Sequence, residues 1–124
     1  MYLLDSNVII DFCNAKLPLN AKNILINSTP ALSVISNIEI FASDKIPESE
    51  ILLLKQFVNA VTIFDVINAK IGAKTISIRQ KNKIKLPDAI IAATALEYNL
   101  ILMTRNVDGF KGVEGITVIN PYSL

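Results

Sequence analysis

The sequence contains no histidine and a single cysteine, Cys13, among its 124 residues. One cysteine excludes a disulfide within the chain. The lack of histidine excludes a zinc site of the Cys/His kind, a histidine general base and a serine-histidine triad. Any metal site must therefore be built from oxygen ligands, which favours Mg²⁺ or Mn²⁺ over softer ions.

Long apolar runs are also absent. Although 52% of the residues are hydrophobic, the longest uninterrupted run, Ala89–Ala93, is far shorter than the roughly 18 residues that span a bilayer. The start of the chain, Met1–Asp5, has no basic segment, and an acid interrupts its apolar residues, unlike a signal peptide. We expect a cytoplasmic protein without a membrane segment, folded as a single domain over residues 1–124.

Charge is nearly balanced, with 12 basic and 11 acidic residues, so net charge indicates no class of partner. Its distribution is less even, because no acid lies between Asp65 and Asp88. We consider the basic residues of this stretch as candidates for binding a phosphate backbone, and the alternative is a solvated helix face. These candidates are Lys70, Lys74, Arg79, Lys81, Lys83 and Lys85.

Apolar periodicity predicts strands that alternate with helices. Short apolar runs predict strands over 2–4, 31–35, 61–64, 100–103 and 116–119. Helical spacing predicts helices over 8–14, 20–27, 36–42, 67–80 and 87–98, and one that starts at Pro47. Because the strands are apolar on both faces, the pattern predicts an α/β three-layer sandwich around a mostly parallel sheet of four or five strands.

Four acids fall where such a sheet would place a ligand. Asp5 ends the first predicted strand, Glu39 lies in the first turn of the helix after the second, and Asp108 follows the fourth. In an open parallel sheet, the carboxyl ends of the strands and the adjoining helix starts share one edge. Asp88, at the start of the helix before the fourth strand, joins them if its helix start faces that edge.

Each of these acids also has a local explanation. Asp5 can cap the first helix, Asp88 can complement a helix dipole, and Asp108 can be a turn residue. Ser36 and Glu39 match a capping box. Together, however, several carboxylates in one crevice repel one another and must protonate or share a cation. Because Mg²⁺ can activate a water for phosphodiester hydrolysis without a histidine, the cluster predicts metal-assisted phosphate chemistry.

Five segments, in order and suitably spaced, match a known pattern: Leu3–Ile10, Leu32–Ile40, Leu86–Ala95, Leu102–Asn106 and Val118–Pro121. The most specific of them reads LPDAIIAATA and contains Asp88. In these segments, which cover nearly the whole chain, the sequence resembles the PIN domain family of nucleases. Within that family it resembles the VapC-like toxins of bacterial toxin-antitoxin pairs.

The resemblance implies a PIN-like fold and Mg²⁺- or Mn²⁺-dependent endoribonuclease activity on RNA. Asp5, Glu39 and Asp88 would hold the metal and position the attacking water. The resemblance also implies a small antitoxin as a partner and a homodimer. Polar residues that would support the site are Ser6, Asn7, Thr104 and Asn106.

One position departs from the family pattern. The family has a fourth acid just before a phenylalanine, whereas this chain has Gly109 before Phe110 and places Asp108 one residue earlier. Either Asp108 reaches the metal through a different turn, or the fourth carboxylate is absent. We favour its absence.

Two other functions are considered. A PIN-like domain that has lost cleavage would only bind RNA or a protein, and Gly109 motivates that alternative. A phosphoacceptor receiver domain, with Asp65 as the acceptor, is also α/β and needs Mg²⁺. Receivers carry a paired acid after the first strand and a lysine after a later one, whereas here Ser6 follows Asp5 and Arg105 follows Thr104.

Overall fold

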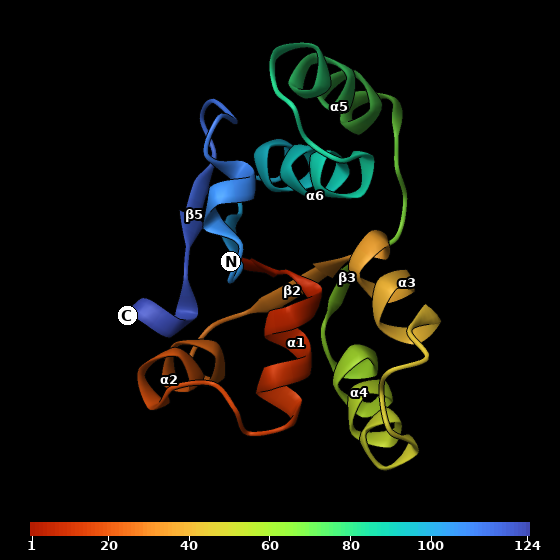
Figure 1. Ribbon diagram of the computed structural model, residues 1–124, viewed down its shortest axis with the longest axis vertical. Helices are drawn as coiled ribbons and strands as arrows, with labels where there is room; N and C mark the ends of the chain where they lie inside the picture. The colour runs from red at the N-terminus through yellow and green to blue at the C-terminus, as the bar shows by residue number, and fades with distance from the viewer.

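The computed structural model describes residues 1–124, in which strands and helices alternate (Figure 1). No helix combines the length and the apolar content that a membrane crossing requires. In chain order the elements are β1 (Tyr2–Leu4), α1 (Ser6–Cys13), α2 (Leu19–Ile26), β2 (Pro30–Ser33), α3 (Val34–Ala42), α4 (Glu48–Ala60), β3 (Thr62–Phe64), α5 (Ala69–Lys81), α6 (Leu86–Glu97), β4 (Ile101–Met103), the 3-10 helix η1 (Val107–Phe110), β5 (Thr117–Ile119) and the 3-10 helix η2 (Pro121–Ser123).

The five strands form one sheet in the order β3-β2-β1-β4-β5, and every neighbouring pair is parallel. The predicted parallel α/β sheet is therefore confirmed. From β1 the chain builds outward to β2 and β3, and then returns to add β4 and β5 on the other side. Ligands of open α/β sheets bind at such a switch point, outside the carboxyl ends of the strands. Receiver domains have the order 2-1-3-4-5, so the receiver alternative is wrong.

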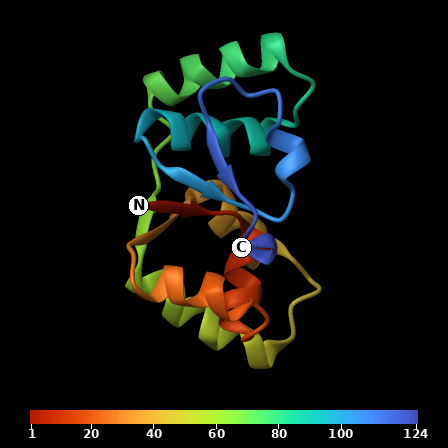
Figure 2. The same ribbon diagram turned by 90° about the vertical axis from the view of Figure 1, so that its left-hand side faces the viewer.

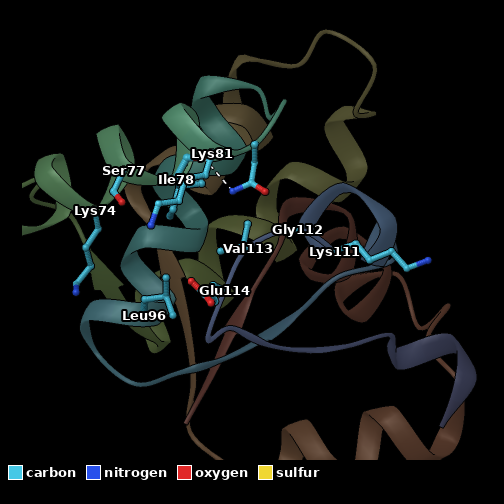
Figure 3. A pocket seen from close by; sticks show the side chains of 10 residues that line it. Lys74, Ser77, Ile78, Lys81, Leu96, Lys111, Gly112, Val113 and Glu114 are labelled. Atoms are coloured by element: carbon cyan, nitrogen blue, oxygen red, sulfur yellow. Dashed lines mark hydrogen bonds between the residues drawn. The ribbon is translucent and has the colours of Figure 1, made fainter.

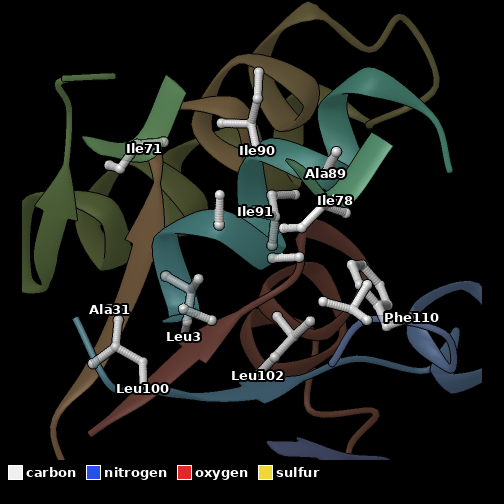
Figure 4. Packing of buried hydrophobic residues seen from close by; sticks show 14 residues of the cluster. Leu3, Ala31, Ile71, Ile78, Ala89, Ile90, Ile91, Leu100, Leu102 and Phe110 are labelled. Carbon is white, nitrogen blue, oxygen red and sulfur yellow. The ribbon is translucent and has the colours of Figure 1, made fainter. Parts of the chain in front are cut away.

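Two helical layers enclose the sheet, with α5 and α6 over one face and α1, α2 and α4 over the other (Figure 2). Successive strand residues alternate between the two cores. Leu3 and Leu102 pack with Ile91 of α6 in one buried cluster, whereas Leu4 and Met103 belong to the cluster on the α1 side. Figure 4 shows the first cluster between α6 and the sheet. Burial on both faces explains why the strands have no polar alternation.

The two ends of α6 place Asp88 at the carboxyl edge of the sheet. The helix ends at Glu97, and two residues later Asn99 has a φ of 53°, which lets the amide of Leu100 donate to the carbonyl oxygen of Ala95 over 2.8 Å. Since β4 begins directly afterwards at Ile101, the end of α6 lies at the amino edge. A helix of 12 residues is about 18 Å long, more than the roughly 10 Å of a three-residue strand, so its start reaches the carboxyl edge.

Helix α3 begins two residues earlier than the sequence predicts. Ser33 caps it, because its hydroxyl oxygen accepts the amide N–H of Ile35 over 3.1 Å. Ser36 is fully buried inside the helix and its hydroxyl has no hydrogen-bond partner. The alternative explanation of Glu39 as part of a capping box with Ser36 is therefore wrong, and Glu39 lies in the second turn rather than the predicted first. The β-branched pair Val34 and Ile35 favours a strand locally, but the Ser33 cap overrides that preference.

Candidate functional site

Asp5 ends β1, and both of its carboxylate oxygens accept hydrogen bonds. The amide N–H of Ser6 donates to Oδ1 over 2.8 Å, and the hydroxyl of Thr104, after the neighbouring strand β4, donates to Oδ2 over 2.7 Å. The residue is only 7% exposed. Asp5 does cap α1, as one of its local explanations requires. The cap accounts for a single oxygen, however, and the bond to Thr104 fixes the carboxylate across the two central strands.

The turn after β4 is joined to the start of α1. The amide of Asn106 donates to Thr104 Oγ1 over 3.1 Å, and the amide of Arg105 donates to Asn7 Oδ1 over 3.4 Å. Thr104 is fully buried, so its hydroxyl is both a donor to Asp5 and an acceptor from the turn. The structure thus brings Asn7, Thr104 and Asn106 into one network around Asp5, and Ser6 enters it through its amide.

Glu39 and Asp88 lie within electrostatic reach of Asp5. Burial raises the pKa of Glu39, and the charges of Asp5 and Asp88 raise it further. Burial also raises the pKa of Asp88, followed by the charge of Asp5, while Lys85 acts in the opposite direction. Asp5 directly follows β1, Glu39 lies in the second turn of α3, which follows β2, and Asp88 lies in the first turn of α6. The carboxyl edge beside the switch point therefore carries a concentrated negative charge.

The chemistry of these donors fits Mg²⁺ or Mn²⁺, since both ions prefer oxygen ligands and a cation relieves the repulsion between carboxylates. As the side chains stand, no three His, Cys, Asp or Glu residues converge into a group that could hold an ion by themselves. Mg²⁺, however, commonly keeps several waters and binds through one or two carboxylates together with substrate phosphates. The residues fit a hydrated ion at this edge better than a closed protein cage.

The structure does not bring Asp108 to the other three acids. Its side chain is 91% exposed and pairs with Lys111 over 3.7 Å. At Gly109, where the sequence pattern expects an acid, the side chain of Asn106 occupies the space that a side chain would need. A β-carbon built on Gly109 would lie 2.5 Å from Nδ2 of Asn106. The edge therefore carries three acids rather than four.

Comparison with known families identifies the domain. The model of the PIN domain family matches residues 2–116, which is most of the chain. The chain belongs to the PIN domain family. The match runs from β1 to Ile116, the residue before β5, and so includes Asp5, Glu39 and Asp88.

Solved structures resemble this PIN domain over its length. It is 31% identical to a chain of a toxin-antitoxin complex from Klebsiella pneumoniae, with a TM-score of 0.78 and 100% of both chains covered. It is 26% identical to a chain of VapBC2 from Rickettsia felis bound to a DNA fragment from their promoter, with a TM-score of 0.78, covering 96% of this chain and 97% of that one. For FitAcB from Neisseria gonorrhoeae, the identity is 25% and the TM-score 0.72, over 100% of both chains. A search of curated proteins found no match.

The predicted basic stretch is divided by the fold of the PIN domain. Lys85 precedes α6, and its effect on the pKa of Asp88 places it beside the acids. Lys74 and Lys81 line a cavity along α5. The remaining basic side chains lie exposed on α5 and on the connection that follows it: Lys70, Arg79 and Lys83.

Sequence reasoning missed a second charged cluster, which anchors the turn after β4. The guanidinium of Arg105 pairs with Asp11 Oδ2 on α1 and lies 4.3 Å from the ring centre of Tyr122, near the end of the chain. The hydroxyl of Tyr122 donates to the same Asp11 oxygen. Burial and this bond raise the pKa of Tyr122 to about 12, against the opposing effect of Arg105. Since Arg105 follows Thr104 directly, the cluster holds the turn that contacts Asp5.

Replacing Thr104 with valine should lower the free energy of unfolding by about 2 kcal/mol in urea denaturation, because it removes a buried donor to a carboxylate. Thr94→Val is a matched control. Thr94 is also buried, but its hydroxyl donates only to the carbonyl oxygen of Ile90 within α6, so we expect a loss of about 1 kcal/mol or less. Equal losses in both variants would show that the bond from Thr104 to Asp5 does not stabilise the protein.

Proposed function

We propose that this PIN domain is a divalent-metal-dependent endoribonuclease. The observation that carries the proposal is that Asp5, Glu39 and Asp88 lie at the carboxyl edge of the sheet, near enough for the charges of Asp5 and Asp88 to raise the pKa of Glu39 and for Asp5 to raise that of Asp88. Perturbed ionisation at a ligand-binding edge is typical of catalytic sites. The sequence has no histidine, so carboxylates are the residues available here to manage protons during phosphodiester hydrolysis.

We assign each of the three acids a role from its surroundings. Asp5 is rigid, since its two hydrogen bonds fix both oxygens, and we assign it the positioning of the cation. Glu39 stays accessible to solvent at the edge, while partial burial of its carboxylate and the two neighbouring acids raise its pKa, which makes the carboxylate a better acceptor for a proton from a water molecule. A bound Mg²⁺ or Mn²⁺ would supply charge stabilisation for the phosphodiester oxygens and lower the pKa of a coordinated water. Asp88 would be a second carboxylate ligand of that ion.

We further propose that the protein is the toxin of a toxin-antitoxin pair. The support is its 31% identity, over both full chains, to a chain of the Klebsiella pneumoniae toxin-antitoxin complex. Exposed apolar side chains can form a protein-binding surface, and Leu52 and Leu53 of α4 are 63% and 48% exposed. We expect a homodimer as well, which light scattering of the purified protein would test against a monomer of 13.6 kDa.

Cleavage of a labelled single-stranded RNA pool tests the nuclease function. We expect internal cuts in Mg²⁺ or Mn²⁺, no cuts in EDTA, and recovery when Mg²⁺ is added back. A DNA pool of the same sequences is the control for the class of nucleic acid. Cleavage that persists in EDTA would overturn the metal dependence, and cleavage of DNA alone would overturn the substrate.

A second candidate function is binding of RNA without cleavage. It is favoured by one pair of observations, namely that Gly109 replaces the expected fourth acid and that no three acids converge on one point. Under this alternative the RNA pool remains intact in every metal but still binds to the protein. The cleavage assay, run beside a binding assay, therefore separates the two candidates.

A further inference from the structure

A concave site lies away from the three acids, none of which lines it. It is a cavity of about 640 Å³ between α5, the end of α6 and residues 111–114 (Figure 3). Three lysines line it, Lys74 and Lys81 from α5 and Lys111 from the segment after η1, together with one acid, Glu114. The net charge of its lining is therefore positive, although the chain as a whole is nearly neutral.

The three lysines form a row. Lys74 and Lys81 are seven residues apart on α5, so two turns of helix separate them on one face. Figure 3 shows Lys74 and Lys111 at opposite ends of the lining with Lys81 between them. Such an extended row matches a linear polyanion better than a single compact anion, because successive charges can meet successive amino groups.

These amino groups are open to exchange of partners. Lys74 pairs with Glu97 over 3.6 Å and Lys111 with Asp108 over 3.7 Å, and both lysine side chains are well exposed, at 43% and 80%. Exposed pairs of this kind contribute about 0–1 kcal/mol each. A chain of phosphates can therefore displace them at little cost.

The floor of the cavity is aliphatic. Ile78, Leu96 and Val113 line it, and no aromatic side chain does. In proteins that bind single-stranded nucleic acid, aromatic side chains make the contacts to the bases by stacking on them. Without rings, this surface can bind the sugar–phosphate backbone but does not select among bases.

The acids do not line the cavity, but a short segment of chain connects its lining to them. Lys81 ends α5 and lines the cavity, and four residues later Lys85 precedes α6 beside Asp88. Four residues span at most about 14 Å, so the backbone at Lys81 lies within that distance of the backbone at Lys85. The carboxylates alone repel the phosphates of an RNA strand. Lysines that bind the strand along the cavity offset this repulsion and bring the strand near the acids.

We propose that this cavity is a docking groove for the backbone of a single-stranded RNA, which it delivers to Asp5, Glu39 and Asp88. The proposal rests on the proposed endoribonuclease function and names the path of its substrate. It retains two residues of the predicted basic stretch, Lys74 and Lys81, and adds Lys111, which lies far from them in the sequence.

Binding of a fluorescein-labelled single-stranded RNA, measured by anisotropy in EDTA over a range of KCl concentrations, tests the groove without any cleavage. Each phosphate contact contributes about 0.7 to the slope of log K against log salt for single strands. Replacing Lys74, Lys81 and Lys111 together with glutamine should reduce the magnitude of that slope by about 2, and weaken binding about tenfold at 100 mM KCl.

The matched control replaces three exposed lysines from the opposite side of the sheet, namely Lys16, Lys45 and Lys55. It removes the same charge, and we expect wild-type binding. An unchanged slope in the groove variant, an equal loss in the control variant, or no RNA binding by the wild type would overturn the proposal. Melting curves of both variants verify that they fold.

Two further outcomes separate the groove from its alternatives. If polyglutamate binds the wild type as tightly as RNA and loses affinity with the same three lysines, the groove is an acidic-protein site and the RNA proposal fails. If the groove variant loses RNA binding while the wild type cleaves no RNA in Mg²⁺, the groove stands and the nuclease function fails. If the wild type cleaves RNA in Mg²⁺ but the groove variant keeps the wild-type salt slope, the nuclease function stands and the groove proposal fails.

Discussion

Replacing Asp5 with asparagine is expected to slow cleavage of RNA by about 10³-fold. A cation that stabilises the transition state by about 4 kcal/mol corresponds to this factor, and the substitution removes the one rigid, negatively charged ligand at the site. Asparagine still accepts the amide of Ser6, since it caps helices as well as aspartate does, so the fold should persist. Single-turnover cleavage of a labelled RNA measures the effect, and Asp88→Asn should give a loss of similar size.

Asp108→Asn is the matched control for both variants. Asp108 is an acid of the same type, but its side chain is almost fully exposed and pairs only with Lys111, so we expect a rate within about twofold of the wild type. Full activity in Asp5→Asn and Asp88→Asn would reject the carboxylate mechanism. A loss in Asp108→Asn as large as theirs would show that this acid does reach the site, through a turn that differs from the one described here.

The fold was largely predictable because its signals are local. The short apolar strands, the proline at the start of α6 and the asparagine after its end each specify structure over a few residues. The strand-helix alternation then restricts the topology to a parallel sheet. From this alone, Asp5 could be placed at the carboxyl edge, since it directly follows the first strand.

The predicted start of α3 was wrong because one local signal, a helix cap, outweighs another, the strand preference of two residues. Helix α3 starts at Val34, although Val34 and Ile35 are β-branched, because Ser33 caps the helix. The prediction took Ser36 as the cap of the helix and Ser33 as part of the strand, whereas Ser33 is the cap and Ser36 is buried inside the helix. Glu39 was therefore given a capping function that it does not have. The sequence does contain the missed signal, since a serine that directly follows an apolar strand is a good cap for the next helix.

Long-range partners left no signal in a single sequence. Arg105 binds Asp11, a residue 94 positions away, and Lys111 joins lysines of α5 around one cavity. Neither pairing follows from periodicity or spacing, because both depend on how the layers pack. The predicted strand ends indicate where the acids lie. No feature of the sequence indicates which basic residues lie beside the acids and which line the groove.

Mg²⁺ is expected to raise the melting temperature of the wild type at pH 7 by about 10 °C when the ion is present at 100 times its Kd. Binding at that concentration stabilises the folded state by about 2.7 kcal/mol. Each kcal/mol shifts the melting temperature of a domain of this size by about 4 °C. Glu39→Gln should show a much smaller shift in melting temperature, because a neutral amide replaces one of the three carboxylates. Equal shifts in the two proteins would place the bound ion away from Glu39.

The pH dependence of Glu39→Gln separates repulsion between the acids from binding of the ion. The folded protein raises the pKa of Glu39 above 4.5, so ionisation of this group costs stability. That cost is absent below the unfolded value and grows as the pH rises through the raised pKa. In EDTA, the variant should therefore melt with the wild type at pH 4 and above it at pH 7. With saturating Mg²⁺ at pH 7 the order reverses, since only the wild type keeps three carboxylates. A variant that melts below the wild type in EDTA at pH 7 would contradict the electrostatic coupling on which the metal site depends.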